Sequence, residues 1–140
     1  MTQQQYMRRT GIGIGAVGVF FAVSALPLLH PAAHLFLTLA YWPMQSVPPD
    51  LVVPLPVLLA ISGGLTAGIG AALWALGTHV SPISPAAAMK VAWLMGWSWF
   101  IVDSAGSIAV GAPFNAVLNL AFLAPILLCS RVPSSAAEAA

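Results

Sequence analysis

The sequence predicts an all-α integral membrane protein built as a four-helix bundle. Hydrophobic residues make up 60% of the chain and charged residues only 5%, against about 25% charged in ordinary soluble domains. Four apolar stretches approach or reach the length that a helix needs to cross a bilayer, and short segments rich in proline, glycine and polar residues separate them. We therefore expect one transmembrane domain over residues 1–140, with the lipid bilayer as its first partner.

The four spans are bounded by helix start and stop signals. The first follows a polar start of ten residues, and Pro56 opens the second, because proline is tolerated in the first turn of a helix. Ser84 is suited to cap the third span, and Gly111 and Pro113 form a turn before the fourth. The predicted spans are residues 11–29, 56–77, 88–110 and 114–129, and the tail 131–140 is expected to be mobile.

The segment between the first two spans is too rich in proline to cross the membrane. It predicts a short interfacial helix over residues 31–42, with Tyr41 and Trp42 at the level of the lipid headgroups. His30 and His34 are four residues apart, so the alternative is a metal site with Asp50 as a third ligand. No further ligand lies nearby, and we predict no metal site.

The basic residues predict the orientation of the bundle. Cytoplasmic loops of membrane proteins are enriched in lysine and arginine. With four spans and both termini cytoplasmic, Arg8, Arg9, Lys90 and Arg131 all fall on that side. The Arg8-Arg9 pair also fits a twin-arginine export signal, but the apolar run after it is long for a signal peptide and more spans follow. We expect a multi-pass protein of the cell membrane, which is the inner membrane if the source is bacterial.

Glycines at helix-packing spacing occur in the first two spans. Gly11 and Gly15 form one pair, and Gly64 and Gly68 form a second pair within a stretch dense in small residues. Such pairs let a neighbouring backbone approach closely, and for the second pair a groove for a flat apolar ligand is the alternative. Residues 13–18 also match GxGxxG, but this motif binds a dinucleotide only after a strand. No cofactor is predicted.

Asp103 is the only charged residue between Lys90 and Arg131. A carboxyl group at the centre of a membrane helix costs roughly 2.5 to 3.5 kcal/mol and avoids lipid, so we expect it to face another helix. A serine shares its helical face, and two asparagines on the following antiparallel helix come to the same level. The predicted cluster, in the outer half of the membrane, consists of Asp103, Ser107, Asn115 and Asn119.

Two interpretations of this cluster stay open. In the first, the asparagines and the serine satisfy a neutral carboxylic acid and hold the last two helices together. In the second, Asp103 takes up and releases a proton, or binds a cation or the polar end of a ligand, and Trp99 walls the pocket. Trp97 is a second candidate for that wall, because both rings lie deeper than an aromatic belt requires.

Catalysis and nucleic-acid binding are not favoured. His79 and Asp103 belong to opposite halves of the membrane, so no Ser-His-Asp set converges, and the sequence contains no phosphate loop, CxxC or HExxH motif. A membrane enzyme acting on lipid or quinone, with Asp103 as its acid or base, remains a third possibility. Four basic residues and a net charge of +1 offer no patch for a phosphate backbone.

Residues 99–123 read WFIVDSAGSIAVGAPFNAVLNLAFL. This segment resembles the end of small four-span bacterial inner-membrane proteins that have no assigned role. The resemblance implies the fold and the location but no activity.

The leading functional hypothesis is a non-enzymatic accessory or binding subunit. It would pack against other membrane subunits, or against copies of itself in a homo-oligomer, through the glycine faces of the first two spans. The alternative is a proton-coupled carrier or a binder of a small apolar ligand, centred on Asp103.

Overall fold

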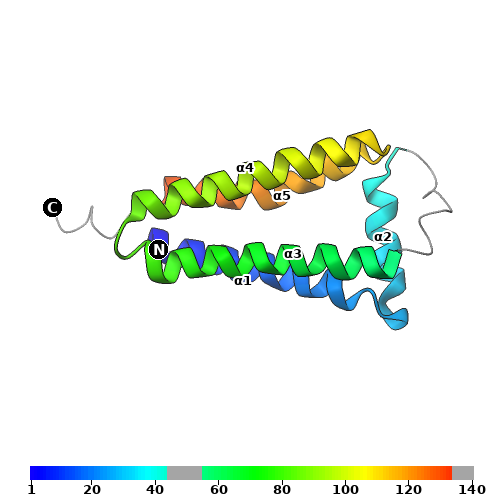
Figure 1. Cartoon of the computed structure of the whole chain (residues 1–140), viewed down its shortest axis with the longest axis horizontal. Coiled ribbons are helices and arrows are strands. Elements are labelled where there is room, and N and C mark those ends of the chain that lie inside the picture. The colour runs from blue at the N-terminus through cyan, green and yellow to red at the C-terminus, as the bar shows by residue number, and fades with distance from the viewer. Residues whose placement is uncertain (44–54, 134–140) are drawn as a thin grey trace.

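The computed structural model describes residues 1–43 and 55–133, and over these residues it contains helices and no strands (Figure 1). The predicted all-α class is therefore confirmed for the described part of the chain. Short 3₁₀ or π turns adjoin three of the helices at Pro27–Leu29, Leu76–Val80 and Cys129–Arg131. The α-helices are α1 (Gln3–Val23), α2 (His30–Ala40), α3 (Leu55–Ala75), α4 (Pro85–Ala109) and α5 (Pro113–Leu128).

The four long helices form two antiparallel pairs that lie as two layers (Figure 1). Helix α1 packs along α3 in one layer, and α4 packs along α5 in the other. Helix α2 runs across one end of the molecule and joins the layers there, where it contacts α5. Each long helix is apolar on most of its surface. The side that faces the paired helix is buried, and the remaining apolar side chains stay exposed.

Two helical segments are long and apolar enough to cross a membrane, Leu55–Val80 and Pro113–Arg131. A third candidate is the pair formed by α1 and the segment Pro27–Ala40, which meets the same requirement only when its two bent parts are taken together. Helix α4 has 25 residues, but its tryptophans, serines and Asp103 lower its mean hydropathy. The described residues therefore hold two or three candidate spans, as expected for a multi-pass membrane protein.

The predicted first span, residues 11–29, is wrong at its C-terminal end, because the helix that contains it runs from Gln3 to Val23. Helix α1 begins at Gln3, because Thr2 and Gln5 form a capping box that holds the polar start of the chain in the helix. It ends at Val23, where the Ser24 hydroxyl donates to the Phe20 carbonyl over 2.7 Å. The chain then turns by 111° into the segment that begins at Pro27. Proline has no backbone N–H and disfavours helix in the residue before it.

The other boundaries agree with the prediction to within a few residues. Helix α3 begins at Leu55 and its helical path extends to Val80, against the predicted 56–77. Ser84 caps α4 as expected, since its hydroxyl accepts from the Ala87 N–H. The segments predicted at 88–110 and 114–129 correspond to α4 and α5. Asp50 and the last seven residues of the expected mobile tail lie outside the described residues.

Helix α2 occupies the place of the predicted interfacial helix. It spans His30–Ala40 and lies across the end of the two layers (Figure 1). Trp42 is 60% exposed, as an interfacial ring would be, but Tyr41 is only 5% exposed. The Tyr41 ring is therefore buried rather than exposed at the surface, and its level relative to the headgroups stays a prediction.

The first residues, residue 133 and the connection between α3 and α4 lie at one end of the molecule. The Gln3 backbone N–H donates to the Pro133 carbonyl over 3.0 Å, and the Gln3 side chain donates to the Cys129 carbonyl over 3.4 Å. A Cβ built on Gly77 would lie within 3.1 Å of both Met7 and Arg8 side-chain atoms. The opposite end carries α2 and the turn between α4 and α5 (Figure 1).

Glycines bring α1 and α3 into backbone contact. A Cβ on Gly11 would lie 2.6 Å from the Gly70 carbonyl oxygen, and one on Gly63 would lie 2.6 Å from the Gly18 carbonyl oxygen. These glycines are seven residues apart on each helix, so they recur on one face every two turns. A Cβ on Gly15 would lie 4.0 Å from the Ala67 carbonyl oxygen, whereas the Gly15 backbone itself closely meets a Cβ built on Gly70, with its Cα at 2.6 Å. Both members of the predicted pair, Gly11 and Gly15, therefore pack against the backbone of α3.

Gly64 and Gly68 do not pack against another helix of this chain. No described atom lies within 4 Å of a Cβ built on either residue. The predicted packing pair is therefore wrong within the chain, because the face of α3 that meets α1 runs through Gly63 and Gly70. Gly64 is one position further along the helix, which turns it by about 100° to the open side.

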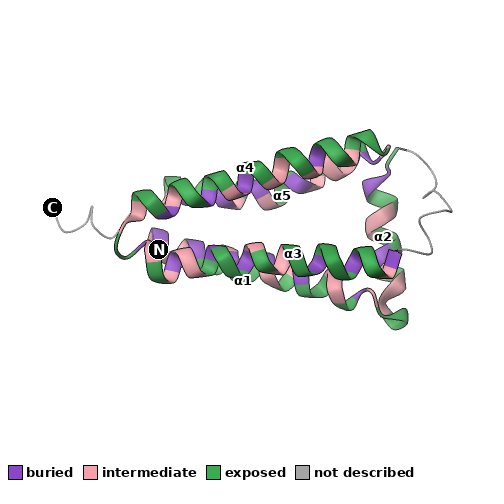
Figure 2. Cartoon of the chain, viewed as in Figure 1, coloured by how far each residue is buried: buried purple, intermediate pink, exposed green. Residues whose placement is uncertain are grey.

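Buried residues recur along the helices (Figure 2), and the hydrophobic ones form two clusters. The larger lies at the end that carries the first residues and includes Met7, Leu73, Ala92 and Ile126. The smaller lies beside α2 and contains Ala33, Leu55 and Leu59. The outer faces carry large exposed apolar side chains, which suit lipid better than water.

Candidate functional site

The turn between α4 and α5 fixes the register of the two helices. Gly111 has φ of 83°, a left-handed conformation that glycine adopts without strain. The Ala112 N–H donates to the Ser107 carbonyl over 2.8 Å and the Gly111 N–H donates to the Ile108 carbonyl over 3.1 Å. These two bonds form a Schellman motif, which ends α4 and lets α5 begin at once at Pro113. The predicted glycine-proline turn is confirmed.

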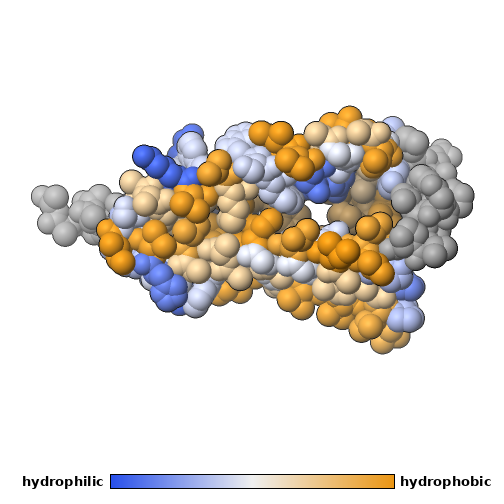
Figure 3. Space-filling view, viewed as in Figure 1, coloured by the Kyte–Doolittle hydropathy of each residue, from blue (hydrophilic) through white to orange (hydrophobic). Residues whose placement is uncertain are grey.

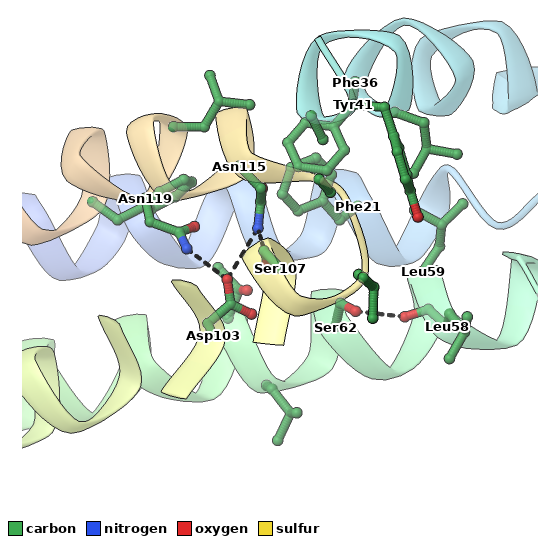
Figure 4. Close-up of a pocket in the computed structure, with 18 of the residues that line it drawn as sticks. Phe21, Phe36, Tyr41, Leu58, Leu59, Ser62, Asp103, Ser107, Asn115 and Asn119 are labelled. Atoms are coloured by element: carbon green, nitrogen blue, oxygen red, sulfur yellow. Dashed lines mark hydrogen bonds between the residues drawn. The ribbon is translucent and has the colours of Figure 1, made fainter. Parts of the chain in front are cut away.

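Asp103 lies at the centre of a hydrogen-bonded cluster across this hairpin (Figure 4). Its Oδ2 accepts from Asn119 Nδ2 over 2.6 Å and from Asn115 Nδ2 over 3.1 Å. Asn115 Nδ2 also donates to Ser107 Oγ over 2.8 Å. The structure therefore brings together all four polar residues that the sequence placed in this cluster. Helix α5 supplies the donors, and α4 supplies the acceptors.

Ser104 is a fifth member that the sequence reasoning missed. Its Oγ accepts from Asn119 Nδ2 over 3.2 Å, and both residues are buried. The prediction considered only residues three and four positions from Asp103, whereas Asn119 reaches from the neighbouring helix to two adjacent residues of α4. The available signal was the spacing of Ser104 and Ser107, which places two hydroxyls on one helical face toward α5.

A cavity of about 570 Å³ opens beside this cluster. It lies between the two helix layers, in the half of the molecule that carries α2, and a hollow is visible there between the layers (Figure 3). Side chains from α1, α2 and α3 form one wall, and side chains from α4 and α5 form the other. The volume falls in the range of ligand pockets, which are commonly 300 to 1,000 Å³.

The cavity walls are mostly apolar and rich in aromatic rings. Phe21 and Phe36 pack together on the α1–α2 side with ring centroids 4.8 Å apart. Trp99 and Phe122 meet on the α4–α5 side with centroids 5.8 Å apart in an edge-to-face arrangement. The polar groups that line it are Tyr41, Ser62, Thr66, Asp103, Ser107, Asn115 and Asn119. A few polar groups within an apolar wall are typical of a small-molecule site.

Trp99 lies in the cavity wall, as predicted for a residue that walls a pocket beside Asp103. Trp97 does not line the cavity; it is 41% exposed and packs edge-to-face against Phe100. The two rings are two positions apart on α4, so they point to opposite sides of the helix. Only one of the two candidate tryptophans therefore belongs to the site.

The arrangement offers hydrogen bonds and a carboxyl group but no paired catalytic groups. Among residues 1–43 and 55–133, no three histidine, cysteine or acidic side chains come close enough to hold a metal ion. His30 instead contacts the Ala25 carbonyl through its Nε2 at 3.3 Å. The chemistry that the described cavity supports is the reversible binding of a molecule with an apolar body and one polar end.

We compared the chain with protein-family models, with curated proteins and with solved structures. No family model, curated protein or solved structure matches it.

Proposed function

We propose that this protein binds a small, largely apolar molecule within the membrane, in the cavity between its two helix layers. The observation that carries the proposal is the position of the Asp103 cluster in the wall of an apolar cavity of about 570 Å³. A cluster that served only to join α4 to α5 would need no such space beside it. Of the interpretations that the sequence left open, the geometry favours ligand binding centred on Asp103.

The proposal includes a four-span topology. Helix α4 lies beside α5 along its length and its 25 residues extend about 37 Å, enough for a hydrocarbon core of about 30 Å. Its one acidic group is covered by donors from α5, so it need not face lipid. Arg8, Arg9, Lys90 and Arg131 then belong to the cytoplasmic side and α2 lies along the outer interface, in the inner membrane if the source is bacterial.

The test is a binding titration with a neutral apolar probe, 1-adamantanol, on the full chain in lipid nanodiscs. Isothermal titration calorimetry, with empty nanodiscs subtracted, should give saturable binding at one site per chain. Leu118 lines the cavity, so Leu118→Trp should weaken binding by about tenfold or more, since a filled pocket excludes the probe. Leu120→Trp is the matched control, because Leu120 does not line the cavity and is 48% exposed.

Absence of saturable heat in the unmodified protein would overturn the proposal. Equal affinity of the two tryptophan variants would overturn it as well, because the probe would then bind outside the cavity.

A second candidate function is association with another membrane helix. Gly64 and Gly68 lie on α3 between exposed Ala60 and Ala72, so small residues recur every four positions on a face that no described part of the chain covers. This pattern favours close helix pairing in membranes, with a second copy or another subunit. Native mass analysis after mild detergent extraction should detect an oligomer or complex that Gly68→Leu dissociates and Gly106→Leu does not. An isolated monomer alone would contradict this function.

A further inference from the structure

The charge of Asp103 has no opposite partner among the described residues. The four basic side chains are Arg8, Arg9, Lys90 and Arg131, and none of them lines the cavity. They lie near the start of α1, in the first turns of α4 and at the end of the turn after α5, whereas residues of α2 line the cavity. A carboxylate without a positive partner is costly in a membrane. A positively charged group of a ligand would therefore be attracted to Asp103.

The amides around Asp103 leave acceptors rather than donors for a ligand. Each asparagine Nδ2 carries two N–H groups. Asn115 directs them to Asp103 and Ser107, and Asn119 directs them to Asp103 and Ser104. Asp103 Oδ1 accepts no hydrogen bond from any described residue, and it points away from the two amides (Figure 4). The carboxylate and the two amides of this cluster therefore complement a group that donates hydrogen bonds or carries positive charge.

The aromatic rings of the cavity favour the same kind of group. A cation over the face of a tryptophan, tyrosine or phenylalanine is attracted by the ring when it lies within about 6 Å of the centroid. Trp99 lines the cavity on the same helix as Asp103, one turn away, and Tyr41 and Phe36 line it on the opposite side. The cavity wall thus combines a carboxylate with several aromatic rings, both of which can bind an apolar cation.

We propose that the ligand of this cavity is an amphiphilic monocation, with an ammonium-type head at Asp103 and an apolar body among the aromatic and aliphatic side chains. This inference rests on the proposed ligand-binding function and adds the chemical class of the ligand. The attraction between unit charges is several times stronger near a protein than in water. A cation should therefore bind more tightly than a neutral molecule of the same shape.

The experiment compares three probes built on one adamantane cage. They are 1-aminoadamantane, which is a cation at neutral pH, neutral 1-adamantanol, and the anion 1-adamantanecarboxylate. Titration into the full chain in nanodiscs of zwitterionic lipid, with empty nanodiscs subtracted, should show the amine binding about tenfold or more tightly than the alcohol, which corresponds to about 1.4 kcal/mol. The carboxylate should bind most weakly.

The variant Asp103→Asn removes the charge and keeps the shape of the side chain. It should lower the affinity for the amine to about that for the alcohol in the same variant, and saturable binding of the alcohol, at whatever affinity, checks that the cavity is formed. Gly106→Ala is the matched control on the same helix, since a Cβ there meets no described atom, and it should keep the preference for the amine.

Equal binding of amine and alcohol by the unmodified protein would overturn the cationic ligand and leave the proposed function in place. A preference for the amine that survives in Asp103→Asn would also overturn it. Failure of all three probes to bind would instead count against the proposed function itself. The comparison in the unmodified protein decides the question even if Asp103→Asn does not fold.

Discussion

Asn119 on α5 donates a 2.6 Å hydrogen bond to Asp103 Oδ2 on α4, and the asparagine is only 4% exposed. The bond crosses the hairpin about two helical turns from Gly111. It therefore holds α4 and α5 together at a distance from the turn where the turn itself no longer fixes their separation. The same carboxyl group lines the cavity. One side chain thus belongs both to the packing of the hairpin and to the candidate site.

We expect a measurable energetic coupling between these two residues. Asn119→Leu should lower the free energy of unfolding by about 1 to 3 kcal/mol, because it leaves a carboxyl group short of a donor. In an Asp103→Asn background the same change should cost less, and the coupling should be about 0.5 kcal/mol or more. A double-mutant cycle by reversible unfolding in mixed micelles, followed by circular dichroism, measures it. Equal costs in the two backgrounds would contradict the coupling.

Neighbouring glycines of α3 should respond in opposite ways to alanine. Gly63→Ala places a Cβ 2.6 Å from the Gly18 carbonyl oxygen, and because backbone cannot move aside cheaply it should destabilise the protein by about 1 to 3 kcal/mol. Gly64→Ala meets no described atom and should be neutral or slightly stabilising. Thermal unfolding in a mild detergent compares them directly. Similar losses for both variants would rule out the α1–α3 contact described above.

Gly111 should be sensitive to a side chain because of its backbone conformation. Its φ of 83° is left-handed, so Gly111→Ala should cost about 1 to 2 kcal/mol, and Gly111→Asn should cost less because asparagine tolerates this conformation better. Gly106→Ala, within α4 and facing open space, is the control and should not destabilise. The free energies of unfolding in detergent provide the measurement, and an equal loss at residue 106 would argue against a turn-specific effect.

The two ends of α4 should lie on opposite sides of the membrane. Ile83 is 86% exposed before α4 begins, and Val110 is 66% exposed where it ends. A membrane-impermeant maleimide applied to intact cells should label Val110→Cys, whereas Ile83→Cys should react only after permeabilisation. The native Cys129 is fully buried and should stay unlabelled in the unmodified protein, which serves as the control. Labelling of both variants from one side would refute the four-span topology.

The sequence was sufficient to predict the elements that depend on local signals. The all-α class follows from composition, the start of α4 from Ser84 and Pro85, and the hairpin turn from Gly111 and Pro113. The meeting of Asp103 with two asparagines could also be predicted, because a short turn fixes the register of antiparallel neighbours.

The features that depend on the partner of each helix could not be predicted. Gly63 and Gly64 are equally suited to close packing by type, and only the position of α1 decides which one is covered. The length of the first span was misjudged because apolar residues continue through the bend after Val23. The cavity depends on the distance between the two helix pairs, and no local pattern in the sequence predicts that distance.

In the proposed four-span topology, the hollow between the helix layers lies at a depth where the surroundings of the protein are lipid. A molecule that dissolves in the bilayer can arrive sideways, without first passing through water. Its occupancy would then follow its mole fraction among the lipids, so two compounds with the same contacts to Asp103 would differ in apparent affinity by the ratio of their partition coefficients.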